Sequence, residues 1–164
     1  MSDEVVLRRA AAEDADAVAE VYLRSFHGAY HFPLAHTDDE VRSWIHEVVI
    51  ATRETWVAVA GGTVMGMMVL HGAELDQLYI APGWTGRGIG GGLVELAKGL
   101  RPGGLSLFTF HVNEGARRFY ERHGFVLIDE SDGSRNEERQ PDVRYAWPGP
   151  TESPSRLPEG RRAG

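Results

Sequence analysis

The chain contains no cysteine, which excludes disulfide bonds, thiolate metal sites and a cysteine nucleophile together. It has no apolar run that approaches the ~20 residues of a membrane-spanning helix. The N-terminal stretch begins Met-Ser-Asp-Glu and lacks the apolar segment of a secretory signal. We therefore expect a cytoplasmic protein that does not act on a membrane.

Basic residues are scarce relative to acidic ones. The 17 Lys and Arg residues face 24 Asp and Glu residues, so the net charge is -7 at pH 7. Because nucleic-acid-binding proteins carry a basic face, this balance argues against DNA or RNA as a partner. It fits a cationic acceptor such as an amine better.

The hydrophobic pattern predicts one α/β domain over residues 1–147, with a mixed sheet of about six to seven strands and helices on both faces. The predicted strands are 5–8, 56–60, 63–70, 74–80, 105–110, 126–129 and 143–147, and the predicted helices lie near 18–25, 37–48, 89–100 and 113–123. The remainder, 148–164, is rich in Pro, Gly, Ser and charge, so we expect a flexible tail.

Two local signals define the second helix and the first hairpin. Thr37 and Glu40 match a capping box, after which Val41, Trp44, Ile45 and Val48 are expected to form one apolar face. The pair 61–62, Gly-Gly, joins two strand-like runs and predicts a tight hairpin turn.

A glycine-dense turn, Gly-Arg-Gly-Ile-Gly-Gly-Gly at 86–92, separates a predicted strand from a predicted helix. Free N–H groups at a helix start bind anions, so a phosphate or pyrophosphate is the natural ligand, against the alternative of a flexible turn without one. Ile89 follows Gly88 where a P-loop needs lysine. Gly86, Gly88 and Gly91 satisfy G-x-G-x-x-G, but the next strand ends Phe-His at 110–111, without the acidic residue that holds a ribose in dinucleotide folds.

Two motifs carry a family resemblance that covers all but the tail. Residues 78–90, Leu-Tyr-Ile-Ala-Pro-Gly-Trp-Thr-Gly-Arg-Gly-Ile-Gly, resemble the central motif of the GCN5-related N-acetyltransferase (GNAT) superfamily. Residues 113–125 resemble its second motif, Asn-x-x-Ala-x-x-Phe-Tyr-x-x-x-Gly-Phe. Thr85 departs from the pattern, because the family usually has Gln or Arg there, and Arg87 could compensate.

The resemblance implies the GNAT fold and an enzyme that transfers an acetyl group from acetyl-CoA to a primary amine. The fourth strand would splay from the fifth and offer backbone groups to pantetheine, the glycine loop would bind the pyrophosphate, and the next motif would hold the CoA arm and sulfur. In that order the implied cofactor-binding residues are Leu78, Tyr79, Ile80, Gly86, Arg87, Gly88, Ile89, Gly90, Gly91, Asn113 and Tyr120.

Amine acetylation requires a deprotonated amine and a proton for the departing thiolate. Tyr120 is the candidate acid, although Ala116, Phe119 and Tyr120 also form a packing stripe typical of a core tyrosine. The resemblance implies Glu74 as the candidate base, acting directly or through water, because family members often carry a catalytic glutamate at this position. Asp76 shares its strand face if no bulge intervenes. Without cysteine, direct transfer in a ternary complex is expected.

The acceptor site is expected between the loop that joins the first two helices and the last strands. Candidate acceptor residues are His27, Tyr30, His31, Trp44 and Asp76. Three histidines fall within ten residues (His27, His31 and His36), but no HExxH pattern accompanies them, so we expect surface or gating histidines and no metal.

The acceptor remains open among small amines, antibiotics, amino acids and peptide or protein amines. The oligomeric state is also open, and a homodimer is compatible with the sequence. A catalytically degenerate CoA sensor of the same fold and a small NAD-binding module are the alternatives.

Overall fold

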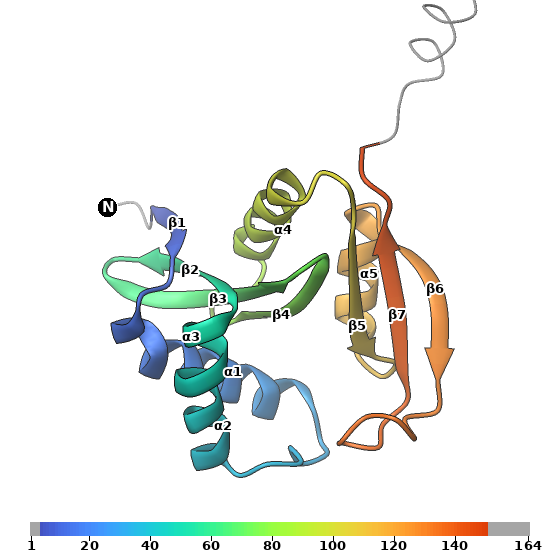
Figure 1. The fold of residues 1–164 in the computed structure, drawn as a ribbon, viewed down its shortest axis with the longest axis horizontal. Coiled ribbons are helices and arrows are strands. Elements are labelled where there is room, and N and C mark those ends of the chain that lie inside the picture. Colours follow the sequence, from blue (N-terminus) through green and yellow to red (C-terminus); the bar gives the residue numbers. More distant parts are fainter. Residues whose placement is uncertain (1–3, 151–164) are drawn as a thin grey trace, which may run out of the picture.

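The computed structural model describes residues 4–150, which form one seven-stranded mixed sheet with the order β1-β2-β3-β4-β5-β7-β6 (Figure 1). The strands are β1 (Val5–Arg9), β2 (Glu54–Ala60), β3 (Thr63–His71), β4 (Glu74–Ile80), β5 (Leu105–Phe110), β6 (Val126–Ser131) and β7 (Asp142–Trp147). The helices are α1 (Ala15–Ala29), α2 (Asp38–Trp44), α3 (Ile50–Thr52), α4 (Ile89–Leu100) and α5 (Glu114–Arg122), with a short 3-10 turn at Ala12–Asp14 and a π-helical segment at Ile45–Val49. The predicted α/β class and mixed sheet are confirmed.

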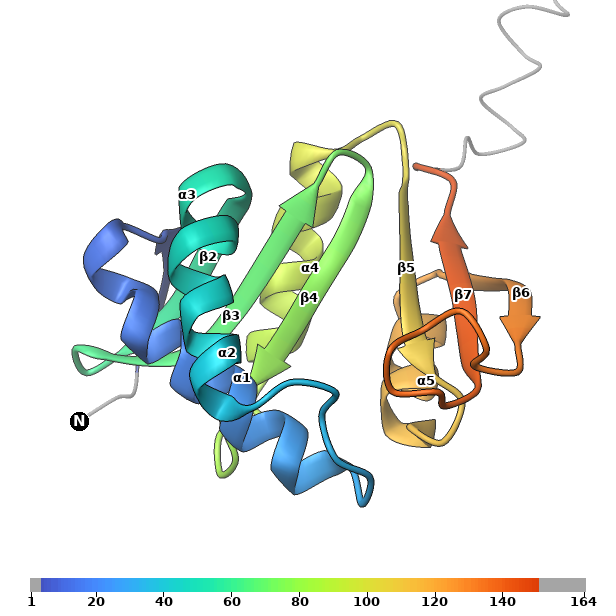
Figure 2. The same ribbon diagram turned by 60° about the horizontal axis from the view of Figure 1, so that its bottom comes forward.

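The sheet consists of two antiparallel parts joined by one parallel pair of strands. β1 to β4 pair in sequence order, and β5, β7 and β6 form the second part. Between the parts, β4 and β5 pair only at Glu74 and Ser106. Beyond that pair the two strands diverge (Figure 2).

Helices cover both faces of the sheet, and each face has its own hydrophobic core. One core packs α1, α2 and the π-helical segment onto β2 and β3, through residues that include Val18, Ile45, Val57 and Met67. The other packs α4 and α5 onto the opposite face, through residues that include Leu93, Ala97, Met68 and Tyr120. Alternation along β3 sends Met67 to one core and Met68 to the other.

The second helix differs from the expected pattern at its end. Its predicted apolar face ended at Val48, whereas the buried residue is Val49, with no exposed area. The reason is the π-helical segment, in which the Ile50 N–H donates to the Ile45 carbonyl, one residue beyond α-helical spacing. The capping box at its start is confirmed, because Thr37 and Glu40 exchange side-chain to backbone hydrogen bonds of 3.1 and 2.8 Å.

The β2–β3 hairpin has the predicted glycine turn. Gly61 and Gly62 both have positive φ, 57° and 80°, which suits two successive glycines in a tight hairpin.

No helix among residues 4–150 has the length and apolar character that crossing a membrane requires. Most of the predicted tail, 151–164, lies outside the described residues.

Candidate active site

A groove of about 780 Å³ opens where β4 and β5 diverge. Its walls come from α1, the end of β4, the turn after it, the start of α4 and the exposed side of α5. The predicted cofactor-binding residues that line it are Leu78, Tyr79, Ile80, Gly86, Gly88, Gly90, Gly91, Asn113 and Tyr120. Thr85, at the position where the family motif usually has a long polar residue, also lines the groove.

The start of α4 has the form of an anion-binding site. Gly88 caps the helix in the left-handed conformation, with φ 83° and ψ 2°. The first N–H groups of a helix have no partner within it, and the helix dipole adds positive potential there. A Cβ atom added to Gly86 or Gly88 would meet no protein atom within 4 Å, so both residues leave the groove open at this point.

The next two glycines have a different role, because they let α5 approach α4 closely. A Cβ atom at Gly90 would lie 3.3 Å from the Phe119 ring, and one at Gly91 would lie 3.4 Å from the His123 ring. The Gly90 contact is tighter than ordinary van der Waals contact and the Gly91 contact is at its lower limit, so the two glycines leave room for the Phe119 and His123 rings against α4.

Two other residues of the glycine turn direct their side chains elsewhere. Ile89 is 4% exposed and packs into the core beneath α4. The Arg87 guanidinium stacks on Trp84, 4.4 Å from its ring centroid. Neither Arg87 nor Ile89 is among the described residues that line the groove, so Ile89 could contact an anion at the helix start through its backbone N–H and not through its side chain.

The exposed edge of β4 presents backbone groups of alternate residues to the groove. The Ala81 N–H donates to the Met65 carbonyl at 2.8 Å, so alternation turns the backbone of Tyr79 toward β3 and that of Leu78 and Ile80 toward the groove. The Ile80 carbonyl accepts a hydrogen bond of 2.9 Å from the Ser25 hydroxyl. Leu78 is therefore the residue whose backbone is most available to a ligand between β4 and β5.

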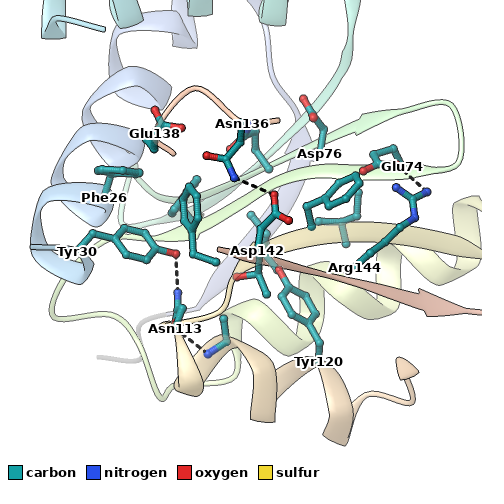
Figure 3. Close-up of a pocket in the computed structure, with 18 of the residues that line it drawn as sticks. Phe26, Tyr30, Glu74, Asp76, Asn113, Tyr120, Asn136, Glu138, Asp142 and Arg144 are labelled. Carbon is teal, nitrogen blue, oxygen red and sulfur yellow. Dashed lines mark hydrogen bonds and ion pairs between the residues drawn. The ribbon is translucent and has the colours of Figure 1, made fainter. Parts of the chain in front are cut away.

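A second cavity of about 720 Å³ adjoins the groove, between α1, β4 and the β5–β7–β6 part of the sheet (Figure 3). The two cavities share five lining residues: Leu78, Tyr79, Asn113, Ala116 and Tyr120. A long ligand in the groove and a second ligand in the cavity would therefore meet at the start and inner face of α5.

The second cavity is acidic. Five carboxylates line it, Glu74, Asp76, Asp129, Glu138 and Asp142, against two guanidinium groups, Arg135 and Arg144. Several of these carboxylates are held in place: the Asp142 carboxylate accepts hydrogen bonds from the Ser131 hydroxyl at 2.7 Å and the Asn136 amide at 3.0 Å. This excess of negative charge favours a cationic ligand.

Glu74 and Asp76 have different partners, because a bulge separates them. Opposite β3, Leu70 pairs with Leu75 and Val69 pairs with Gln77, which leaves Asp76 as the extra residue. Glu74 accepts a hydrogen bond of 3.1 Å from the Ser106 hydroxyl, and its carboxylate lies 3.6 Å from the Arg144 guanidinium. Asp76 instead forms an ion pair of 2.7 Å with Arg53. From the sequence, Glu74 and Asp76 are expected to share a strand face only if no bulge intervenes, and the strand does contain a bulge.

Tyr120 lies where the groove and the acidic cavity meet. Its side chain is 7% exposed and packs against Phe119, Phe125 and Tyr145, with ring centroids 5.2 to 6.5 Å away. Burial raises the pKa of the Tyr120 phenol, so the hydroxyl keeps its proton well above neutral pH.

A hydrogen bond between Asn113 and Tyr30 spans the junction of the two cavities (Figure 3). Asn113 caps α5, since its Oδ1 accepts the Ala116 N–H at 3.0 Å. Its Nδ2 donates to the Tyr30 hydroxyl at 2.8 Å, which links the start of α5 to the end of α1. Burial raises the pKa of Tyr30 as well.

Of the predicted acceptor residues, Tyr30 and Asp76 line the acidic cavity. His27 and His31 do not, and His27 is exposed and contacts Asp38 at 3.2 Å. Trp44 also lies elsewhere, half-buried against Tyr22 with Arg53 over its ring. Across residues 4–150, His, Asp and Glu side chains are nowhere gathered in threes in a way that could hold a metal ion.

Several lining residues carried no signal in the sequence. They belong to β5, to β7 and to the β6–β7 loop, and include Phe108, Asn136, Glu138, Asp142 and Arg144. They reach the cavity only through the pairing of β5 with β7 and the folding of the loop, and no local pattern encodes either. Alternation along a correctly paired β7 would have placed Asp142 and Arg144 on one face.

Comparisons with known proteins identify the family of this chain. Residues 51–127 match the family model described as an acetyltransferase (GNAT) domain. The peptidyl-lysine N-acetyltransferase YjaB of Escherichia coli strain K12 is 31% identical over 133 residues, which span 78% of this chain and 86% of that protein. The peptidyl-lysine N-acetyltransferase YiaC of the same strain is 25% identical over 144 residues, 87% of this chain and 97% of that protein.

Solved structures share the fold. The solution structure of apo-form YjaB from Escherichia coli superposes with a TM-score of 0.74 at 27% identity, over 90% of this chain and 99% of that one. The PaiA N-acetyltransferase of Thermoplasma acidophilum, solved in complex with coenzyme A, gives a TM-score of 0.67 at 22% identity, over 88% of this chain and 99% of that one. The chain belongs to the GNAT acetyltransferase family and is an N-acetyltransferase.

Proposed function

We propose that the protein transfers the acetyl group of acetyl-CoA to the ε-amine of a lysine in a polypeptide, by direct attack in a ternary complex. The observation that carries this proposal is the meeting of the groove and the acidic cavity at Tyr120. A donor in the groove and an amine in the cavity would come together beside one protonated hydroxyl.

The groove fits coenzyme A by its chemistry. The start of α4, with Gly86 and Gly88 open toward the groove, offers N–H groups to a pyrophosphate. The backbone of Leu78 faces the groove and would pair with the pantetheine arm. The Asn113 amide, which lines both cavities, would contact the same arm. Bound acetyl-CoA supplies the activated acyl group as a thioester.

The protein's own groups would handle the protons. The amine attacks the thioester carbonyl carbon, so that a C–N bond forms and the C–S bond breaks. Tyr120, which is protonated at neutral pH, donates its proton to the departing thiolate. Before the attack, Glu74 takes one proton from the lysine ammonium, directly or through water. As the tetrahedral intermediate collapses, the nitrogen loses its second proton to water and the Tyr120 phenolate regains a proton from water. The backbone N–H of Leu78 stabilises the oxyanion.

A lysine side chain is the acceptor that the charges favour. Its amine is protonated at neutral pH, and the five carboxylates that line the cavity outnumber its two guanidinium groups and Arg53, which is paired with Asp76. YjaB and YiaC, to which this chain is similar, are named peptidyl-lysine N-acetyltransferases. Neutral or anionic amines would find no comparable partner in this cavity.

The proposal is tested by titrating acetyl-CoA calorimetrically and then following free thiol release with a panel of amines. We expect micromolar binding, and turnover with lysine-containing peptides rather than with neutral or anionic amines. Binding without thiol release for any amine would support a CoA sensor instead. A higher affinity for NAD(H) than for acetyl-CoA would contradict the assignment of the groove.

A further inference from the structure

One face of the C-terminal part of the sheet is left open. α5 lies behind β5, β7 and β6, whereas no helix of the described chain lies in front of them (Figures 1 and 2). The side chains that face α5, Leu107, Val143 and Tyr145, are buried in the core. Their neighbours along each strand therefore face the uncovered side.

The pairing of the strands identifies the residues on this side. Phe108 pairs with Arg144, which pairs with Asp129, and all three line the acidic cavity. The next row along the strands is Ser106, Ala146 and Val126. Because residues paired across strands share a face, the two rows form one continuous surface. We call these six residues, Ser106, Phe108, Val126, Asp129, Arg144 and Ala146, the open sheet face.

The open sheet face presents apolar side chains to solvent. Phe108 is 53% exposed and Val126 is 58% exposed. The Arg144 guanidinium stacks on the Phe108 ring, 4.6 Å from its centroid, and leaves the rest of the ring accessible. Exposed apolar side chains next to a binding cavity are typical of a surface that contacts a partner.

On the other side of the acidic cavity, contacts join the α1–α2 loop to the β6–β7 loop. The Ala35 N–H, in the α1–α2 loop, donates to the Glu138 carboxylate at 3.0 Å. In the same pair of loops, His36 contacts the Glu137 carboxylate at 3.0 Å. A polypeptide that carries a lysine into the cavity would therefore approach over the open sheet face rather than between these loops.

We propose that the open sheet face binds the acceptor polypeptide, and that Phe108 and Val126 select lysines that have an apolar residue within two positions. This inference rests on the proposed function, since it concerns the chain around the acceptor lysine. The surface is continuous with the acidic cavity through Phe108 and Arg144, so one extended segment can occupy both.

The test compares two blocked peptides, Leu-Ala-Lys-Ala-Leu and Ala-Ala-Lys-Ala-Ala, as acceptors with saturating acetyl-CoA. We expect the kcat/KM of the leucine peptide to be about tenfold higher, the size expected when a small apolar group gains a binding surface. Val126→Ser and Phe108→Ser should each lower this ratio toward one.

Leu127→Ser is the matched control. Leu127 is adjacent to Val126 and is also exposed, at 41%, but it pairs with Tyr145 and so lies on the other face of β6. We expect this variant to leave the ratio of the two peptides unchanged. Equal effects of Val126→Ser and Leu127→Ser would overturn the proposal, because a loss of fold or stability would act on both.

Other outcomes separate this inference from the proposed function. Acetylation of both peptides at equal kcat/KM would overturn the role of the open sheet face and leave the proposed function intact. Acetylation of neither peptide, despite acetyl-CoA binding, would overturn both. Sedimentation that shows a dimer, converted to monomer by Val126→Ser, would mean that this face joins two copies of the chain.

Discussion

Replacing Gly88 by alanine should separate the structural role of this glycine from its role in the groove. Gly88 has φ 83°, a conformation that costs an L-residue about 1–2 kcal/mol. For a domain of this size, that loss lowers the Tm by about 2 to 8 °C. Its added methyl group would meet no protein atom within 4 Å and would occupy the groove that Gly88 lines.

Gly83→Ala is the matched control for this variant. Gly83 has a similar φ of 91°, its Cβ would also meet nothing within 4 Å, and it is absent from the lining of the groove. Both variants should therefore lose similar stability in thermal melts. Only Gly88→Ala should weaken acetyl-CoA binding, because its methyl group keeps a phosphate from the N–H groups of α4.

The size of the effect follows from the bonds that would be lost. A hydrogen bond to a charged group contributes about 1.5–3 kcal/mol, so the loss of one should raise the Kd of acetyl-CoA about tenfold or more. Isothermal titration calorimetry of both variants provides the measurement. If Gly88→Ala binds acetyl-CoA as tightly as Gly83→Ala, the pyrophosphate does not bind at the start of α4.

Three further predictions concern the protons of the site and the loop contact. Tyr120→Phe should lower kcat about 100-fold and leave the calorimetric Kd of acetyl-CoA nearly unchanged; an unaltered kcat would remove Tyr120 as the acid. Glu74→Gln should lower kcat/KM most at neutral pH. The kcat/KM should recover as the pH approaches the lysine pKa of about 10.4, because the amine then loses its proton unaided. A uniform loss at all pH values would argue against Glu74 as the base. The hydrogen bond to Glu137 raises the pKa of His36, so this pair stabilises the loop contact below the ordinary histidine pKa and is lost as the pH rises through the raised value. In Glu137→Gln the His36 pKa, followed by NMR, should fall toward its ordinary value, and an unchanged titration would mean that the contact does not form in solution.

The features that the sequence predicted correctly depend on neighbouring residues alone. The Thr37 capping box and the Gly61–Gly62 hairpin are set by contacts within four residues. The same holds for the start of α4, where the left-handed conformation of Gly88 ends the turn. Such signals can be read without any knowledge of the fold.

The features that the sequence did not predict depend on packing between distant segments. The π-helical segment at Ile45–Val49 shifts the buried position by one residue, which helical periodicity could not anticipate. The bulge at Asp76 accompanies a different ion-pair partner for this carboxylate than for Glu74, and it is defined only by the register of β4 against β3. The contact of Glu138 with Ala35 joins segments 103 residues apart.

Tyr120 connects the stability of the domain to its proposed chemistry. The sequence left two interpretations of this residue, a core tyrosine and a catalytic acid. In the structure Tyr120 belongs to the core beneath α4 and α5, and it also lines both cavities. The burial that makes it part of the core is the cause of its raised pKa, and a raised pKa keeps the proton that an acid must donate. The two interpretations therefore describe one arrangement, in which the packing of Tyr120 against Phe119, Phe125 and Tyr145 fixes the position of the hydroxyl that the proposed reaction needs.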